Sequence, residues 1–377
     1  MTMRVLMVTP GFRGRPGGVE VHTSELVAGL AAKGADVSVI TASRDVRGRV
    51  EENFDDCRAT VYPAWCLRSM SIAPRAVAGA LRRRSRADVV HVHSYHATTA
   101  LAALAGRRPV VFTPHYHGAS GHTVAAGLLH RVYRHLGARI LRRADAIVCV
   151  STAERDLLTR DFPFVAGKVE VIPNGVRVDE LRRADPFPDA GPVVLCVGRL
   201  EPYKRFADVI RAFAAVAPPA RLVIVGDGSE RDELRSLVDE LGLTDRIVLC
   251  GRVGDDDLHR WLRTATVLVS MSEQEAFGMA PIEAAAAGAR VVLSDIPAHR
   301  EIFAEYLTGF GVVVGREAPL AEHIATQLAA GRPATPADVP DWTSVSRRTA
   351  DIYRRLTSAS ASASASASAE DSIRQDN

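Results

Sequence analysis

The chain has 377 residues, more than one hydrophobic core usually serves, so we expect two domains. Its hydrophobic fraction of 47% is ordinary for a globular protein, and a net charge of +3 gives no support for nucleic-acid binding. No apolar run approaches the roughly 20 residues that span a bilayer, and the N-terminus shows no signal-peptide pattern. Five cysteines without C-x-x-C spacing suit a reducing compartment, so we expect a cytoplasmic protein without disulfide bonds.

Short apolar runs alternate with amphipathic stretches, which is the pattern of βαβ units and of parallel sheets covered on both faces. In the first half of the chain, the predicted strands cover residues 4–9, 36–41, 89–93, 110–113, 146–150 and 169–172. Gly17 and Gly18 follow the first of these strands and open a helix. Glycine lets the backbone approach a ligand closely, and a helix N-terminus favours an anion, so both residues are candidate phosphate contacts. A plain entry from loop to helix is the alternative.

Two groups of histidines follow strands in this first half. His115 and His117 come after residues 110–113, and a neutral imidazole there can exchange a hydrogen bond with a sugar. His91, His93 and His96 form the other group. Because no cysteine or acidic residue accompanies them, we favour strand packing or acceptor contact over a metal site.

Residues 75–86 hold the densest run of arginines, among several basic pairs that we interpret as solvated faces. This run is also a candidate contact for anionic lipid or for an acidic acceptor, which would place the protein at the inner face of a membrane.

Residues 173–192 contain residues that interrupt helices and strands, among them Asn174-Gly175. They indicate a boundary between two domains. The second half repeats the alternating pattern, with predicted strands at residues 193–197, 222–225, 247–250, 267–270, 291–294 and 311–314. We therefore expect a first domain over residues 1–176 and a second over residues 190–341. Residues 342–356 form a helix candidate, and the low-complexity Ser/Ala segment at residues 357–377 is expected to be disordered.

Ligands of such sheets lie beyond the carboxyl ends of the strands, and charged residues follow two strands of the second half. Arg199 and Lys204 come after residues 193–197, where an arginine fork and a lysine point charge suit a diphosphate. Glu275 and Glu283 flank a glycine turn after residues 267–270. Their carboxylates can accept hydrogen bonds from sugar hydroxyls, while the turn directs backbone N–H groups toward an anion.

The pairing of G-R-x-x-x-x-K (Gly198 to Lys204) with E-x7-E (Glu275 to Glu283) resembles the retaining glycosyltransferases of family 4. The resemblance extends to about residue 356 and includes the turn Pro173-Asn174-Gly175-Val176. It implies an α/β protein of the GT-B fold, with two facing Rossmann-like doubly wound domains and a C-terminal helix that crosses back to the first domain. The first domain would hold the acceptor and the second the donor.

The resemblance also implies a role for each matching residue. Arg199 and Lys204 would bind the donor pyrophosphate, Glu275 the donor sugar and Glu283 the ribose, while His115, with His117 as a competitor, would reach the sugar. Further donor contacts are expected from Gly17, Gly18, Arg252, Val253, Phe277, Gly278, Met279 and Ala280. The implied activity is metal-independent and cofactor-free hexosyl transfer from a UDP- or GDP-sugar, in cell-envelope glycan, glycolipid or secondary-metabolite glycoside synthesis.

Other interpretations compete with this one. Gly226-Asp227-Gly228 follows a strand but lacks the third glycine of a dinucleotide fingerprint, so a nicotinamide site is disfavoured. Asp255-Asp256-Asp257 contains the D-x-D pattern of metal-dependent transferases, although acidic residues at a helix start are the ordinary explanation. A sugar-nucleotide epimerase of similar architecture and a non-catalytic sugar-nucleotide binding protein remain alternatives. The small-molecule, lipid or glycan acceptor, the nucleotide and the oligomeric state do not follow from the residues.

Overall fold

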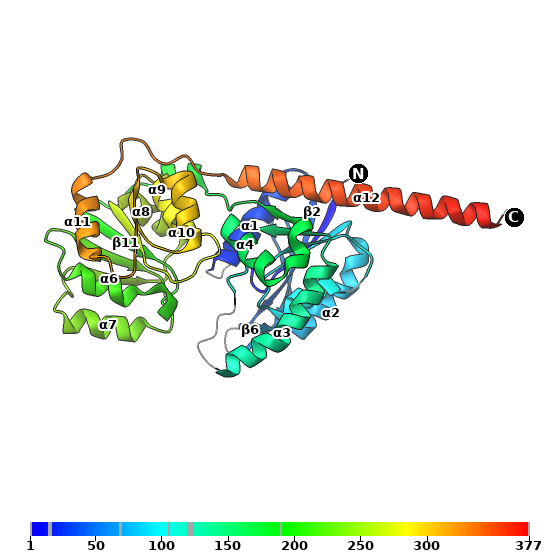
Figure 1. Ribbon diagram of the computed structural model, residues 1–377, viewed down its shortest axis with the longest axis horizontal. Helices are drawn as coiled ribbons and strands as arrows, with labels where there is room; N and C mark the ends of the chain where they lie inside the picture. The colour runs from blue at the N-terminus through cyan, green and yellow to red at the C-terminus, as the bar shows by residue number, and fades with distance from the viewer. Residues whose placement is uncertain are drawn as a thin grey trace. The chain divides into compact units, whose positions relative to one another are not determined.

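The structure is a computed structural model that describes residues 2–13, 17–67, 70–104, 106–118, 124–188 and 191–375. The chain divides into two compact units (Figure 1). Unit 1 comprises Met1–Pro173 and Trp342–Asn377, and unit 2 comprises Asn174–Asp341. The division falls at the Pro-Asn-Gly turn, and the chain returns to unit 1 for its last helix.

Unit 1 is built on an eight-stranded sheet in the order β10-β9-β8-β7-β1-β2-β4-β3. Within the described residues, β3 is the one strand of this sheet that runs antiparallel to its neighbour. The strands are β1 (Arg4–Val8), β2 (Asp36–Ser43), β3 (Val50–Asn53), β4 (Arg58–Pro63), β7 (Val89–His93), β8 (Val110–Thr113), β9 (Ala146–Cys149) and β10 (Val169–Val171). A separate hairpin joins β5 (Trp65–Leu67) to β6 (Met70–Ile72).

Helices cover both faces of this sheet. One face packs on α2 (Pro74–Arg83), α3 (Val124–Arg143) and α4 (Thr152–Asp161), and Val90 and Val92 of β7 belong to this core. Because side chains alternate along a strand, His91 and His93 of β7 point to the other face, which α1 (Gly18–Ala31) and α12 (Trp342–Gln375) cover.

The last helix, α12, packs along α1 in unit 1. Its buried residues recur at helical spacing: Trp342, Val345, Ser346, Thr349, Ile352 and Tyr353. The two helices approach closely at Gly29, where an added Cβ would lie 2.6 Å from the Cβ of Ser346. The helix continues to Gln375, which differs from the predicted disorder after residue 356. Alanine, the strongest helix former, alternates with serine there, which favours the backbone hydrogen bonds of a helix.

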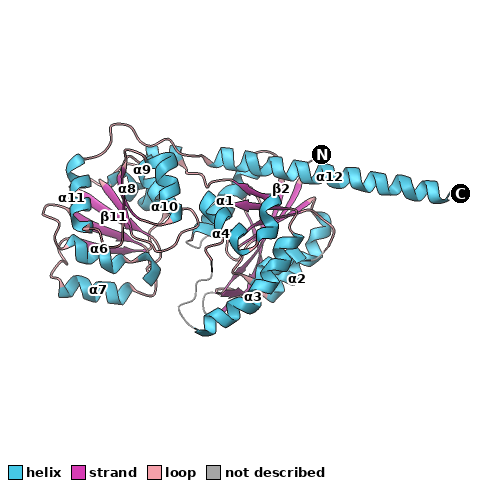
Figure 2. Cartoon of the chain, in the orientation of Figure 1, coloured by secondary structure: helices cyan, strands magenta, loops and turns pink. Residues whose placement is uncertain are grey.

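Unit 2 contains a six-stranded parallel sheet in the order β13-β12-β11-β14-β15-β16. Its strands are β11 (Val193–Val197), β12 (Arg221–Val225), β13 (Ile247–Gly251), β14 (Val267–Ser270), β15 (Arg290–Ser294) and β16 (Gly311–Val314). One face carries α6 (Phe206–Phe213), α7 (Arg231–Glu240) and α11 (Leu320–Ala330), and the other carries α8 (Asp255–Thr264) and α9 (Met279–Ala286) (Figure 2). The short helices α5 (Val178–Arg183) and α10 (Pro297–Ile302) complete the unit.

All twelve predicted strands are present, with ends that differ by at most two residues. The four strands between Val50 and Ile72 were not predicted. β3 is exposed along its whole length, so it lacks the apolar alternation by which a strand is recognised. The hairpin strands β5 and β6 are three residues each, which is too short for a periodic signal.

Candidate functional site

The strand order of unit 2 creates a switch point between β11 and β14. β11 pairs with β12 on one side and with β14 on the other, and all of these strands are parallel. The chain therefore leaves β11 and β14 in opposite directions, which opens a crevice beyond their carboxyl ends. The loops at this point carry Arg199 with Lys204 and Glu275 with Gly278, so the topology brings both predicted motifs to one place.

Lys204 and Glu275 meet directly. The Nζ atom of Lys204 lies 2.5 Å from Oε1 of Glu275, although 71 positions separate the residues in the chain. Their side chains are 16% and 18% exposed, so the pair is largely shielded from water yet reachable by a ligand. The contact joins a cation suited to phosphate with a carboxylate suited to hydroxyl groups.

The carboxylate of Glu275 stays ionised. Burial by itself raises the pKa of Glu275, but the charge and the hydrogen bond of Lys204 outweigh burial, and the net result is a lowered pKa. A hydrogen bond from Ser272 acts in the same direction. At neutral pH the residue is therefore an acceptor of hydrogen bonds, which is the form that binds neutral hydroxyls.

Arg199 is exposed, and its guanidinium donates a hydrogen bond of 3.3 Å to the hydroxyl of Tyr203. The backbone carbonyl of Tyr203 in turn accepts a 2.8 Å bond from the N–H of Glu273. The loop after β11 is thus joined to the loop after β14 by main chain as well as by the Lys204–Glu275 pair. This double connection fixes the spacing of the two charged motifs.

The turn before α9 exposes a helix N-terminus next to Glu275. Gly278 adopts a positive φ of 103° and is the N-cap residue, with Met279 and Ala280 in the first helical turn. Phe277 is buried and anchors the turn. The first N–H groups of a helix have no partner within the helix, so those of this turn can bind an anion. Glu283 lies one turn further along α9 and is half-buried.

His299 is a buried site residue that the sequence analysis missed. Its Nδ1 lies 3.0 Å from the hydroxyl of Ser294, while Nε2 has no hydrogen-bond partner among the described residues. A Cβ placed on Gly278 would lie 3.8 Å from that nitrogen. Burial lowers the pKa of His299, so the ring is neutral although the charge of Glu275 acts in the opposite direction. No local pattern in the sequence distinguishes this histidine from a surface residue.

The glycines at positions 226 and 228 serve backbone packing. A Cβ on Gly226 would lie 1.8 Å from the carbonyl oxygen of Gly198, and one on Gly228 would lie 2.4 Å from that of Leu200. The loops after β11 and β12 therefore touch main chain to main chain, which explains a glycine pattern without a dinucleotide fingerprint. Arg252 is exposed and Val253 half-buried in the adjacent loop after β13, where Gly226 N–H donates to the Gly251 carbonyl at 2.8 Å.

In unit 1, Gly17 and Gly18 begin α1 beyond the carboxyl end of β1. A Cβ on Gly17 would lie 2.2 Å from a carboxylate oxygen of Glu20, the end of a flexible side chain that can move aside. A Cβ on Gly18 would have no neighbour within 4 Å among the described residues. The backbone of Gly18 is therefore accessible, as contact with a ligand requires.

His115 lies beyond β8 with a positive φ of 46°, which is uncommon for a residue other than glycine. Its Nε2 atom lies 3.5 Å from Nδ1 of His93. Burial lowers the pKa of His115 well below its ordinary value, and neighbouring histidines lower it further, so the ring is neutral. His117 instead stacks on His96, with ring centroids 4.7 Å apart.

Glu154 holds the His115 loop in place and was missed by the sequence analysis. One of its carboxylate oxygens accepts a 2.5 Å hydrogen bond from the N–H of Tyr116, and the other accepts a 2.6 Å bond from the N–H of Val150. The residue is 2% exposed. A buried carboxylate that satisfies two backbone donors ties the loops after β8 and β9 together.

The interpretation of the arginine run as a solvated face is wrong for Arg84, which is 6% exposed and donates to the carbonyl of Ala102 at 3.2 Å. Arg83 is partly exposed and pairs with the exposed Glu51 at 2.8 Å. Arg75, Arg82 and Arg86 are exposed. Among the helices of the described chain, none has the length and apolar content needed to cross a membrane.

Asp255, Asp256 and Asp257 occupy the first turn of α8, which confirms the prediction of a helix start. Asp255 also forms an ion pair of 3.0 Å with Arg177. Both observations give this acidic run a structural role.

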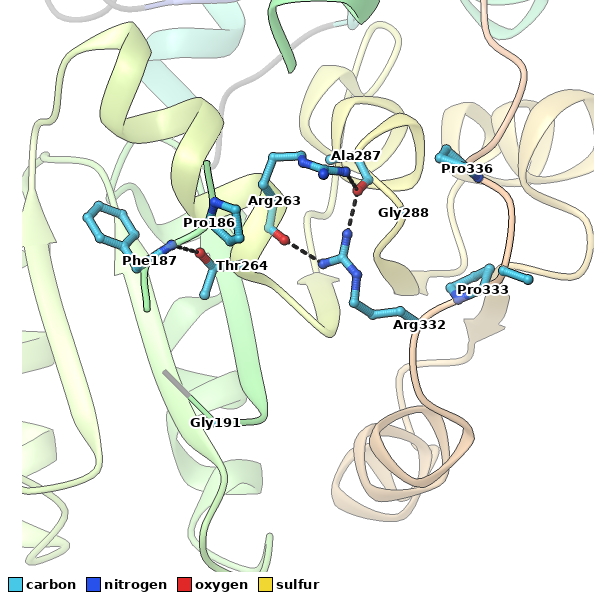
Figure 3. Close-up of a pocket in the computed structure, with 11 residues that line it drawn as sticks. Pro186, Phe187, Gly191, Arg263, Thr264, Ala287, Gly288, Arg332, Pro333 and Pro336 are labelled. Atoms are coloured by element: carbon cyan, nitrogen blue, oxygen red, sulfur yellow. Dashed lines mark hydrogen bonds between the residues drawn. The ribbon is translucent and has the colours of Figure 1, made fainter. Parts of the chain in front are cut away.

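A pocket of about 500 Å³ lies at the opposite end of the unit 2 sheet (Figure 3). Its lining residues include Thr264 and Gly288, which precede β14 and β15, so it opens at the amino edge of the strands. Arg332 crosses this region and donates 2.6 Å and 2.5 Å hydrogen bonds to the carbonyls of Arg263 and Ala265. The guanidinium of Arg332 is therefore used to hold loops together.

Two family models match the chain in succession. Glycosyltransferase Family 4 matches residues 16–180, and Glycosyl transferases group 1 matches residues 177–334. Phosphatidyl-myo-inositol mannosyltransferase of Mycobacterium leprae is 30% identical, over 95% of this chain and 98% of the relative. GDP-mannose:cellobiosyl-diphosphopolyprenol alpha-mannosyltransferase of Xanthomonas oryzae pv. oryzae is also 30% identical, over 93% of this chain and 96% of the relative.

Solved structures agree on the fold. Sucrose-phosphate synthase from Thermosynechococcus elongatus superimposes with a TM-score of 0.73 at 20% identity, over 95% of this chain and all of the other. HepE from Anabaena, in complex with UDP-glucose, gives a TM-score of 0.68 at 19% identity, over 96% of this chain and all of the other. Two Rossmann-like units of this kind define the GT-B fold. The chain belongs to the family 4 glycosyltransferases, of the glycosyl transferases group 1 type.

Proposed function

We propose that the chain is a retaining glycosyltransferase that transfers a hexose from a UDP- or GDP-sugar to an acceptor without a metal ion or cofactor. The observation that carries this proposal is the 2.5 Å contact between Lys204 and Glu275. It joins a diphosphate-binding cation to a hydroxyl-binding carboxylate at the switch point of the sheet. Arg199 on the same loop adds a second, exposed cation.

Charge stabilisation is the main catalytic effect in this proposal. The leaving diphosphate develops negative charge as the glycosidic bond breaks, and Arg199 with Lys204 stabilises that charge. The departing phosphate oxygen then takes the proton of the acceptor hydroxyl, which attacks from the same face, so the sugar keeps its anomeric configuration. Neutral His115 of unit 1 exchanges a hydrogen bond with the donor sugar. Exclusion of water from the assembled site protects the sugar from hydrolysis.

We propose further donor contacts at the positions described above. Glu283 binds the ribose hydroxyls. The other proposed contacts, many of them made by backbone groups, are Gly17, Gly18, Arg252, Val253, Phe277, Gly278, Met279 and Ala280.

We propose that the acceptor is held by unit 1 and belongs to cell-envelope glycan, glycolipid or secondary-metabolite glycoside synthesis. The relatives named above are a phosphatidyl-myo-inositol mannosyltransferase and a cellobiosyl-diphosphopolyprenol mannosyltransferase, which supports a lipid-linked acceptor. Arg75, Arg82 and Arg86 are exposed on and just after α2 and could bind anionic headgroups. A cytoplasmic enzyme with peripheral contact to the membrane fits these features.

Donor binding is the first test. Melting temperatures measured with a panel of UDP-, GDP- and ADP-sugars, in the presence of a chelator, should rise with the concentration of one nucleotide sugar. A ligand at about 100 times its Kd stabilises the folded protein by about 2.7 kcal/mol, which such a measurement detects. Lys204→Ala and Glu283→Ala should lose the shift.

Lys33→Ala is the matched control, because Lys33 is an exposed lysine of unit 1 outside the site, and this variant should keep the full shift. If folded wild-type protein responds to no nucleotide sugar, the donor site is wrongly assigned. A shift that needs a divalent ion would contradict the metal-independent mechanism.

A further inference from the structure

Three buried histidines from three separate elements converge in unit 1. His22 comes from α1, His93 ends β7, and His115 lies in the loop beyond β8. One ring nitrogen of each lies within 4.8 Å of the others. The three residues are 2%, 0% and 9% exposed, so water reaches them mainly at His115. In the sequence, His93 instead groups with His91 and His96.

The spacing of two of these nitrogens suits a shared metal ion better than a hydrogen bond. Nδ1 of His93 and Nε2 of His115 are 3.5 Å apart, beyond the usual 2.7–3.2 Å range for such bonds. Two zinc–nitrogen bonds of about 2.0–2.1 Å at a tetrahedral angle place their nitrogens about 3.3 Å apart. The longer distances in the cluster must close by up to about 1.5 Å, which rotation of an imidazole about its Cβ–Cγ bond can supply.

A sulfur atom sets the orientation of the His93 ring. Nε2 of His93 lies 2.9 Å from Sδ of Met7, and a thioether offers only lone pairs. The proton of the neutral ring therefore belongs on Nε2, which leaves the lone pair of Nδ1 directed toward His115. Metal-binding histidines are held in the same way, by donation from the nitrogen that does not bind the ion.

The neighbouring histidine, His91, already has hydrogen-bond partners and packs against the cluster. His91 lies 2.6 Å from the hydroxyl of Tyr353 through Nδ1 and 2.8 Å from that of Thr113 through Nε2. Its ring also packs behind His93, with centroids 4.2 Å apart. Both of its nitrogens are used, so it cannot be a ligand without breaking these bonds.

We infer that His22, His93 and His115 form a binding site for a first-row divalent transition ion such as Zn²⁺ or Co²⁺. Three imidazoles are a ligand set that these ions prefer, and a fourth position remains for water, as in open zinc sites. Because the proposed function gives His115 a contact with the donor sugar, a bound ion would occupy that residue and oppose transfer. The ion is thus an inhibitor in this scheme, which agrees with transfer that needs no metal.

Titration of untagged, chelator-treated protein with Co²⁺ tests the site. Wild type should bind one equivalent, show the visible bands of four-coordinate cobalt, and lose them when Zn²⁺ is added. His22→Ala and His93→Ala should weaken binding by about 100-fold or more. His96→Ala and His135→Ala are the controls and should leave the titration unchanged, since neither residue belongs to the cluster.

A measurement on the unmodified protein covers the case in which a variant fails to fold. X-ray absorption of the zinc-loaded wild type should show three imidazole ligands. Absence of imidazole ligands, or cobalt binding that survives in both His22→Ala and His93→Ala, would overturn the inference. Lys204→Ala should still bind cobalt although it loses the nucleotide-sugar response, so a failed donor site and a failed metal site give different results.

Discussion

At the scale of single residues, the Lys204–Glu275 pair predicts a specific dependence of stability on pH. The folded protein lowers the pKa of Glu275 below its ordinary 4.5, so ionisation of this group favours folding. The contribution is complete above the unfolded pKa and is lost as the pH falls through the lower folded value. Near neutral pH, wild type should be more stable than Glu275→Gln by about 1–3 kcal/mol, and the gap should shrink below about pH 4.

Urea unfolding of both proteins at several pH values measures this gap. Glu240→Gln, which alters an exposed glutamate of the same unit, is the control for removal of one charge. A gap that stays constant into the acid range would show that the carboxylate charge does not contribute. Greater stability of Glu275→Gln at neutral pH would show that desolvation of the pair exceeds its attraction.

The role of a single residue could be predicted from the sequence only where the residue belongs to a motif of fixed spacing. Lys204 and Glu275 were expected to share a ligand, and the structure adds that they contact each other. His299 and Glu154 were not found, because each acts through partners far away in sequence or through backbone N–H groups. The metal candidate His22 was also missed, since a lone histidine within an amphipathic helix usually indicates packing.

At the scale of elements, the loop after β11 depends on a glycine in the loop after β12. Gly226 has a positive φ of 143°, and its Cβ position lies 1.8 Å from the carbonyl oxygen of Gly198. Gly226→Ala should therefore cost about 3 kcal/mol or more through steric overlap and backbone strain, and should weaken donor binding by displacing Arg199. Thermal unfolding and the nucleotide-sugar titration measure the two effects.

Gly315→Ala is the matched variant, because its Cβ would meet no described atom within 4 Å and its φ is ordinary. It should change stability by no more than about 0.5 kcal/mol. Equal behaviour of the two variants would mean that the close approach of the two loops is not needed.

Strands could be located from the sequence where burial of both of their faces gives a recognisable hydrophobic pattern. Parallel strands such as β11 and β14 are continuous apolar runs and were located from the sequence. β3 lies at the edge of its sheet and has an exposed, acidic sequence, so pairing with β4 rather than its own composition makes it a strand. Contacts between loops, such as that of Gly226 with Gly198, have no local signature at all.

At the scale of the whole molecule, α12 predicts two different outcomes of C-terminal truncation. Among residues 342–360, for which burial is described, the buried residues of this helix end at Tyr353, and Ser358 to Ser360 are exposed. A chain that ends at Ser360 should keep the stability of unit 1 within about 0.5 kcal/mol. A chain that ends at Asp341 loses four buried apolar side chains, each worth about 1.5–3 kcal/mol, and unit 1 should not fold.

Circular dichroism and urea unfolding of the two truncated chains decide between these outcomes. Loss of structure in the chain that ends at Ser360 would assign a structural role to the Ser/Ala segment. A folded unit 1 in the chain that ends at Asp341 would show that α1 and the sheet suffice without α12.

The return of the chain to unit 1 also sets an order of events during translation. Everything that α12 covers, including His91 with its bond to Tyr353, is synthesised before unit 2, whereas α12 itself emerges after unit 2. Domains generally fold as units while the N-terminal part leaves the ribosome first. Unit 1 is therefore the first unit to be synthesised and the last to be completed. Until unit 2 has been synthesised, nascent unit 1 exposes the apolar face beside α1. That interval is when a chaperone would be most needed.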